Sequence, residues 1–192
     1  LAFARALDLK ESRVQFTPDV LPSDLVGFSV YQKETGKFVY HAGAVMCNLF
    51  LGDEINRTSS KTQAALLEVM EEGKVTVDNE THPVPQPFVV IATENPTGSS
   101  GTQMLPESQL DRFMISLSMG YPDHENLVEL LRDRQTKNPL ENAKAVITKE
   151  EVVMLQDQVQ KVYMADSILN YIATLAAVSY THLRAHETDS YL

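Results

Sequence analysis

The chain has 192 residues, of which 43% are hydrophobic and 22% charged, a composition typical of a folded globular protein. Its formal net charge of -10 repels phosphate backbones and anionic membrane surfaces, so we expect neither nucleic acid nor a membrane as a partner. A single cysteine, Cys47, excludes an intrachain disulfide, and no apolar run approaches the roughly 18 to 20 residues of a membrane span, so we expect a cytoplasmic protein.

The first 43 residues predict the end of a helix, a strand and a hairpin. Residues 1–10 carry apolar side chains at helical spacing, as if the chain began inside a helix. Residues 13–17 alternate apolar and polar side chains as a strand does. Two β-prone stretches between residues 24 and 43 then flank Glu34-Thr35-Gly36, a sequence typical of a turn. We therefore expect an inserted hairpin here.

Two short apolar runs, residues 44–51 and 88–93, predict buried strands of a parallel sheet. Each run ends in polar side chains, Asp53 and Glu54 after the first and Asn95 after the second. Between them, capping hydroxyls and a terminal glycine predict a helix over residues 61–72, and a second hairpin over 74–84.

The remaining pattern is mostly helical. It predicts a short helix over 106–113, a strand over 115–119, and helices over 123–137, 148–163 and 167–177. Thr148 and Glu151 form a capping box at the start of the second long helix. Strands alternating with helices, followed by helices alone, predict an α/β parallel-sheet core over residues 1–122 and a small all-α subdomain over 123–177.

Four polar residues follow the predicted strands or a short helix in positions that suit phosphate chemistry. Ligands bind at the carboxyl ends of strands in open α/β sheets, where Asp53 could hold Mg²⁺ and Glu54 could orient a water. Asn95 could contact a phosphate oxygen or a water, and Arg112 could reach a phosphate across a subunit boundary. The alternatives are a solvated strand end, an Asx turn and a surface ion pair.

Five motifs together resemble one family. They are QFTPDVLPSDLVG at 15–27, LGDEINR at 51–57, QAALLEVMEE at 63–72, ATENP at 92–96 and LPESQLDRF at 105–113. In order and spacing, over about residues 13–134, they resemble the AAA+ ATPase family, and within it the MoxR branch.

The resemblance implies roles for five residues. Asp53 and Glu54 would be the Walker B pair, with Asp53 at the Mg²⁺ ion and Glu54 as the catalytic base. Asn95 would be the sensor 1 residue, Arg112 the arginine finger that acts on a neighbouring subunit, and Arg57 a contact between subunits at the nucleotide site.

The resemblance also implies an activity and partners. The family hydrolyses ATP with Mg²⁺ in a ring, commonly a hexamer, and acts as a chaperone in complex assembly or in metal-cofactor insertion. Its partners are client proteins and often a protein with a von Willebrand A domain. The two predicted hairpins would be the helix-2 insert, about residues 27–43, and the pre-sensor 1 insert, about residues 74–86.

The sequence departs from the family at both ends. It contains no phosphate-cradling G-x-x-x-x-G-K-[ST] loop, so we expect a chain truncated at its N-terminus, without the first core strand, that binds ATP poorly and is inactive alone. Residues 178–192 lose the helical pattern and resemble a translated sequencing adapter, so we expect a non-native tail and an incomplete lid. The pair His182 and His186 is a weak zinc signal.

Three hypotheses follow. The first is an ATP-hydrolysing MoxR-like chaperone, present here as a fragment. The second, favoured by the missing loop, is a non-catalytic protein-interaction module derived from an AAA+ core. The third, a free-standing Mg²⁺-dependent hydrolase built on Asp53 and Glu54, ranks last because these strand ends supply too few metal ligands.

Overall fold

The structure is a computed structural model that describes residues 1–95, 104–118, 120–136 and 143–188. Contacts divide the chain into two compact units, residues 1–153 and 154–192. The sequence-based division into a core (1–122) and a helical subdomain (123–177) stays a prediction.

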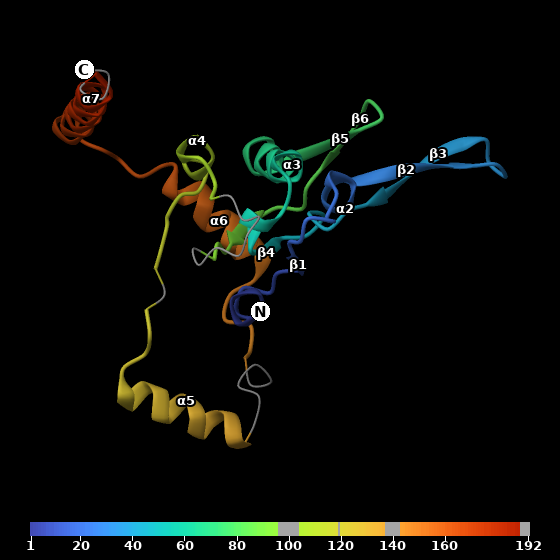
Figure 1. Ribbon diagram of the computed structural model, residues 1–192, viewed down its shortest axis with the longest axis horizontal. Coiled ribbons are helices and arrows are strands. Elements are labelled where there is room, and N and C mark those ends of the chain that lie inside the picture. The colour runs from blue at the N-terminus through green and yellow to red at the C-terminus, as the bar shows by residue number, and fades with distance from the viewer. Residues whose placement is uncertain (96–103, 119, 137–142, 189–192) are drawn as a thin grey trace. The chain divides into compact units, whose positions relative to one another are not determined.

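A three-stranded parallel sheet forms the centre of the first unit (Figure 1). Its strands are β1 (Glu11–Gln15), β4 (Leu49–Asp53) and β7 (Val89–Ala92), in the order β1-β4-β7. The register pairs Gln15 with Asp53 and Gly52 with Ala92, so the three carboxyl ends lie at one edge. The parallel sheet confirms the predicted α/β fold class.

The predicted strand over residues 44–51 is wrong in its first half, since β4 begins only at Leu49. Residues 44–48 form turns instead: Cys47 N donates to Val45 O at 2.8 Å, and Asn48 N donates to Lys10 O at 2.8 Å. Val45 and Cys47 are nevertheless buried in the core. The apolar run therefore indicates only that these residues are buried, and it does not distinguish a buried strand from a buried turn.

Helix α3 (Ser60–Glu72) forms where its caps predict it. Ser59 Oγ accepts from Thr62 N at 3.2 Å, and Gly73 follows the helix in the left-handed region with φ 65°. Its buried face joins the sheet and the hairpin roots in one core cluster. The cluster consists of Phe16, Leu25, Val45, Cys47, Phe50, Ile55, Leu66, Val69, Val75, Val84 and Leu105.

Two hairpins project from the body of the first unit (Figure 1). One consists of β2 (Gly27–Gln32) and β3 (Lys37–Ala42), and the short helix α2 (Pro22–Val26) precedes it. The other consists of β5 (Lys74–Val77) and β6 (Glu80–Pro83). Asp78 and Asn79 between them have φ 50° and 66°, as a two-residue type I′ turn requires. Both hairpins lie where the sequence predicts them.

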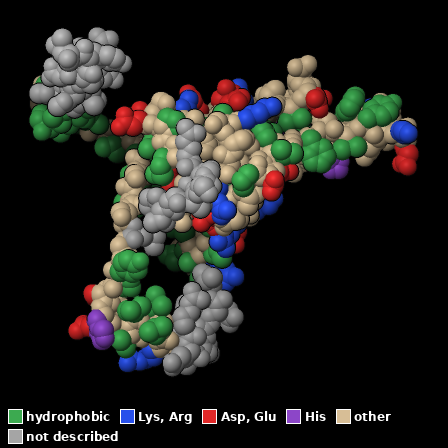
Figure 2. Space-filling view, in the orientation of Figure 1, with side chains coloured by type: hydrophobic (Ala, Val, Ile, Leu, Met, Phe, Trp, Pro, Cys, Tyr) green, Lys and Arg blue, Asp and Glu red, His purple; other side chains and the backbone are tan. Residues whose placement is uncertain are grey.

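The remaining elements are helices. They are α1 (Ala2–Ala6), α4 (Glu107–Leu110), α5 (His124–Thr136), α6 (Lys149–Val159) and α7 (Asp166–Thr188). The capping box of α6 is present, because Thr148 N donates to Glu151 Oε2 at 2.8 Å and Glu151 N donates to Thr148 Oγ1 at 3.3 Å. Hydrophobic side chains are exposed on α5 and on the β2/β3 hairpin (Figure 2).

The predicted strand over residues 115–119 is not present in residues 115–118, and Met119 lies outside the described residues. Within the described chain, no strand pairs with this segment, and its apolar side chains are open to solvent: Ile115 is 70% and Leu117 80% exposed. A strand needs a neighbouring strand to accept and donate its backbone hydrogen bonds. An apolar pattern in the sequence does not show whether such a neighbour exists.

The helix predicted to end at Ala177 continues to Thr188 as α7. Residues 178–188 contain neither glycine nor proline, and a helix makes its hydrogen bonds within its own segment. Residues 189–192 lie outside the described residues. The non-native origin of the tail stays a prediction.

Candidate nucleotide site at the strand ends

The polar residues predicted to follow the strands do meet at one edge of the sheet. Asp53 is the last residue of β4, and Thr93 to Asn95 follow β7. Two backbone bonds hold the ends together: Thr93 N donates to Gly52 O at 2.9 Å, and Ile55 N donates to Thr93 O at 3.0 Å. The structure therefore brings the two predicted groups of site residues to neighbouring positions.

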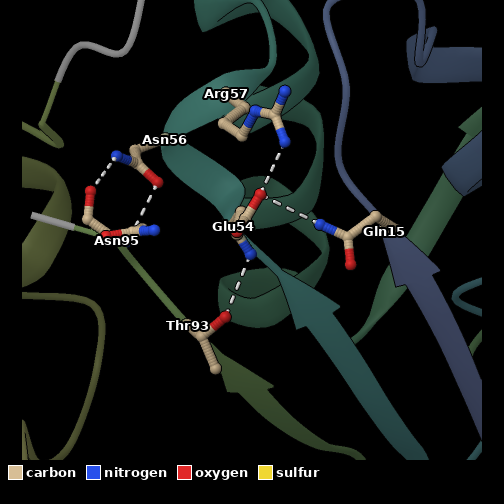
Figure 3. Close-up of polar contacts among 6 residues, drawn as sticks. All are labelled: Gln15, Glu54, Asn56, Arg57, Thr93 and Asn95. Atoms are coloured by element: carbon tan, nitrogen blue, oxygen red, sulfur yellow. Dashed lines mark hydrogen bonds and ion pairs between the residues drawn. The ribbon is translucent and has the colours of Figure 1, made fainter. Parts of the chain in front are cut away.

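Glu54 lies at the centre of this edge (Figure 3). Its backbone is left-handed, with φ 56° and ψ 51°, and its N–H donates to Thr93 Oγ1 at 3.0 Å. Its carboxylate Oε2 accepts from Gln15 Nε2 at 3.1 Å and from Arg57 Nη1 at 2.8 Å. Donors from two sides thus fix the position of a partly exposed carboxylate.

Asp53 has a partner that the sequence analysis missed. Arg13 of β1 donates to Asp53 Oδ2 from Nε at 2.7 Å and from Nη2. Arg13 and Gln15 lie two residues apart on one strand and therefore share a face of the sheet. The sequence did contain a signal for these contacts. Arg13 and Gln15 are spaced to share a face of β1, and the neighbouring parallel strand β4 ends in Asp53, with Glu54 next.

Asn95 is held by a second asparagine that the sequence analysis also missed. Asn56 Nδ2 donates to Asn95 O at 3.2 Å, and Asn95 N donates to Asn56 Oδ1 at 3.4 Å. Asn56 is 2% exposed and lies in the 3₁₀ turn η1 (Ile55–Arg57) that follows Glu54. The reciprocal pair fixes the backbone of Asn95 beside the turn that carries Glu54 (Figure 3).

The turn that carries Glu54 and Asn56 is itself anchored to α3. Gln63 Nε2 donates to Ile55 O at 3.1 Å and to Thr58 O at 3.4 Å. Gln63 is buried, so it satisfies backbone carbonyls that water does not reach. Hydrogen bonds therefore connect the turn that carries Glu54 both to Asn95 and to α3.

Arg112 does not join these hydrogen bonds. Its Nε donates to Glu71 Oε2 at 3.3 Å and its Nη1 donates to Ser108 O at 3.0 Å. Glu71 is in the last turn of α3, whereas the Glu54 turn precedes the first. Within this chain Arg112 forms the surface ion pair that the sequence analysis gave as the alternative.

Cys47 is not a nucleophile in this structure. Burial raises the pKa of its thiol to about 11, although the Lys10 ammonium and a backbone hydrogen bond at Ser12 lower it. The thiolate, which is the reactive form, is therefore scarce near neutral pH.

A resident metal ion does not fit the described residues by themselves, since they contain no group of three or more His, Cys, Asp and Glu side chains placed to hold one. A single carboxylate such as Asp53 fits Mg²⁺ that arrives with phosphate oxygens as its other ligands. The side chains of His182 and His186 lie outside the described ones. In the described part of the chain, no helix combines the length and apolarity needed to cross a membrane.

Known proteins match this chain over most of its length. The sequence model of the ATPase family associated with various cellular activities (AAA) matches residues 1–115. The uncharacterized protein YeaC of Bacillus subtilis is 47% identical over 181 residues, which are 94% of this chain and 57% of that protein. Chaperone MoxR1 of Mycobacterium tuberculosis is 37% identical over 170 residues, 88% of this chain and 45% of that protein.

A solved structure is similar to this chain in fold. A candidate ATPase from Cytophaga hutchinsonii superposes with a TM-score of 0.81 at 40% identity, covering 91% of this chain and 53% of that one. The chain thus spans about half the length of each of these three proteins. With an AAA match over residues 1–115 and MoxR proteins among its relatives, the chain belongs to the MoxR branch of the AAA+ ATPase family.

Proposed function

We propose that this chain is the catalytic segment of an ATP-hydrolysing MoxR-type chaperone, and that Glu54 is its general base. The observation that carries the proposal is the Glu54 carboxylate, held by Gln15 and Arg57 at the carboxyl end of β4 directly after Asp53. A carboxylate fixed at that edge of a parallel sheet is placed where such folds bind ligands.

Each residue of the edge has a distinct part in the proposed reaction. Glu54 accepts a proton from the attacking water and orients it, while Asn95 presents an amide to the γ-phosphate. Asp53 would hold Mg²⁺ together with phosphate oxygens, in place of its present ion pair with Arg13. When bound, Mg²⁺ neutralises charge on the phosphates.

The two arginines act at subunit boundaries in this proposal. Arg112 is the arginine finger, which leaves its own Glu71 and stabilises negative charge on the nucleotide of a neighbouring subunit. Arg57, already beside Glu54, contacts nucleotide at the same boundary. Both roles require a homo-oligomeric ring, which we propose to be a hexamer.

The ring would work on client proteins. A relative that carries the name chaperone supports this part of the proposal. We propose complex assembly or metal-cofactor insertion as the outcome, together with a partner that has a von Willebrand A domain. The β2/β3 and β5/β6 hairpins are the proposed helix-2 and pre-sensor 1 inserts.

The 192 residues lack the phosphate-cradling loop, so we propose that they do not hydrolyse ATP alone. The test accordingly uses the full-length protein that carries this segment. Glu54→Gln should lower its ATP turnover by about 10²-fold or more while leaving its ATP affinity within about twofold, because only the base is lost.

The control is Glu72→Gln, an exposed glutamate paired with Lys74 away from the strand ends, which should leave turnover unchanged. Turnover in Glu54→Gln equal to that of the unsubstituted protein would remove Glu54 as the base.

A second candidate, a non-catalytic protein-interaction module, is favoured by the missing loop. It predicts that the full-length protein neither binds nor hydrolyses ATP, whatever residue stands at position 54. ATP binding by the unsubstituted full-length protein would exclude this second candidate.

A further inference from the structure

A pair of stacked rings joins the two hairpins, in addition to contacts between β2 and β5. Tyr40 of β3 and His82 of β6 stack with their ring centroids 3.8 Å apart and their planes 7° from parallel. Each residue belongs to a different antiparallel pair, so the contact joins two small sheets that share no backbone hydrogen bonds. It is the ring pair with the shortest centroid separation in the described structure.

Tyr40 is anchored at the root of its own hairpin. Its hydroxyl donates to Val26 O at 2.6 Å, at the end of α2, and burial raises its pKa, although a backbone hydrogen bond at Gly43 lowers it. A Cβ on Gly27 would lie 2.3 Å from His41 O and 2.7 Å from Tyr40 Cε2. Gly27 also has φ 93°, a conformation that favours glycine. A side chain at position 27 would therefore clash with both the neighbouring strand and this ring.

The ring of His82 lies in the stack with one nitrogen unpaired. Its Nε2 is buried and has no hydrogen-bond partner, which is uncommon for a buried polar atom. Across the β5/β6 pair its partner in register is Val75, which is buried in the core cluster together with Val84. In this position the imidazole packs against the Tyr40 ring, and its Nε2 makes no hydrogen bond.

We propose that the Tyr40–His82 stack is a joint that makes the two hairpins move as one rigid body. The proposal goes beyond the ATPase function and does not depend on it. Helix α3 ends at Glu72, and only Gly73 separates it from β5, so a shift of α3 reaches the β5/β6 hairpin directly. The same shift reaches β2/β3 through α2, which packs against α3 and directly precedes β2, and the stack adds a second connection between the two hairpins.

The joint is tested first without any substitution. Native-state hydrogen exchange of the 192-residue chain, in increasing denaturant, measures the free energy at which each amide opens. The amides of β2 and β3 and those of β5 and β6 should converge on one opening event. Two separate opening events, with different denaturant dependence, would overturn the proposal.

Substitutions then test the ring contact itself. His82→Ala should speed amide exchange in β2/β3, the other hairpin, by about two- to tenfold, the range expected for one aromatic pair. His82→Phe keeps a ring and should retain the slow exchange. Acceleration confined to β5/β6 in His82→Ala would overturn the joint, and if that variant does not fold, the variant-free experiment decides.

The matched control is a ring pair within a single hairpin. Tyr31 and Phe38 lie on β2 and β3 with centroids 5.3 Å apart. While the stack is intact, Phe38→Ala should speed exchange in both hairpins, because they open as one unit. In a His82→Ala background, Phe38→Ala should speed exchange in β2/β3 alone. Equal further acceleration of both hairpins by Phe38→Ala in the His82→Ala background would show that coupling does not need the Tyr40–His82 stack, and would overturn its role as the joint.

Discussion

The described residues before 96 and those after 103 differ in what covers their apolar side chains. Apart from Leu105, every buried hydrophobic residue of the described chain lies in residues 1–95. The later helices form nonetheless, with apolar side chains such as Leu130 exposed to solvent. Helices satisfy their backbone internally, whereas residues 115–118, with an equally apolar pattern, form no strand.

We expect the largest difference in stability between alanine substitutions of one leucine before residue 96 and one leucine after residue 103. Leu66 is fully buried in α3, and Leu66→Ala should lower the free energy of unfolding by about 2–5 kcal/mol because it leaves a cavity. Leu130 is 51% exposed in α5, and Leu130→Ala should change that free energy by less than about 0.5 kcal/mol. Urea unfolding followed by circular dichroism measures both, and similar losses would mean that α5 is covered in solution.

We expect a smaller difference in stability between alanine substitutions of a buried and an exposed asparagine. Asn56→Ala removes the reciprocal pair with Asn95 at a buried position and should lower the free energy of unfolding by about 1–3 kcal/mol. Asn126→Ala removes an exposed hydrogen bond to Asp123 and should cost under about 0.5 kcal/mol. Urea denaturation of the two variants compares these costs, and a neutral Asn56→Ala would contradict the role given to the pair.

The smallest effect is a pH dependence at the start of α6. The backbone N–H of Thr148, and then its hydroxyl, hold the pKa of Glu151 below its usual value. A carboxyl with a lowered folded-state pKa stabilises the helix above its unfolded pKa and loses that contribution as the pH falls through the folded value.

We therefore expect a slight loss of helical circular dichroism on acidification that Glu151→Gln does not show, since glutamine keeps the capping box without titrating. An identical acid profile for both proteins would assign the loss to other carboxyls.

Local signals predicted local structure well. The hydroxyl of Ser59 and the glycine at position 73 act within a few residues of themselves, so the bounds of α3 could be read from the sequence. The turn at Asp78 and Asn79 is local in the same sense. The polar strand ends were also predictable, because parallel strands place their carboxyl ends at one edge.

Interactions between distant segments were harder to predict. The ion pair of Arg13 with Asp53 joins residues 40 positions apart, and its register depends on which strands are neighbours. The same is true of Asn56 with Asn95. The functional roles of Asp53, Glu54 and Asn95 stay predictions, as do those of Arg57 and Arg112.

Glu54 has a left-handed backbone conformation, which favours glycine over any residue with a Cβ. A side chain with a Cβ in the left-handed region costs about 1 kcal/mol relative to glycine. A glycine would avoid that cost, but it would also remove the carboxylate that accepts from Gln15 and Arg57. The proposed function gives this strain a reason, since the backbone at position 54 would then be held in a costly conformation in order to present that carboxylate.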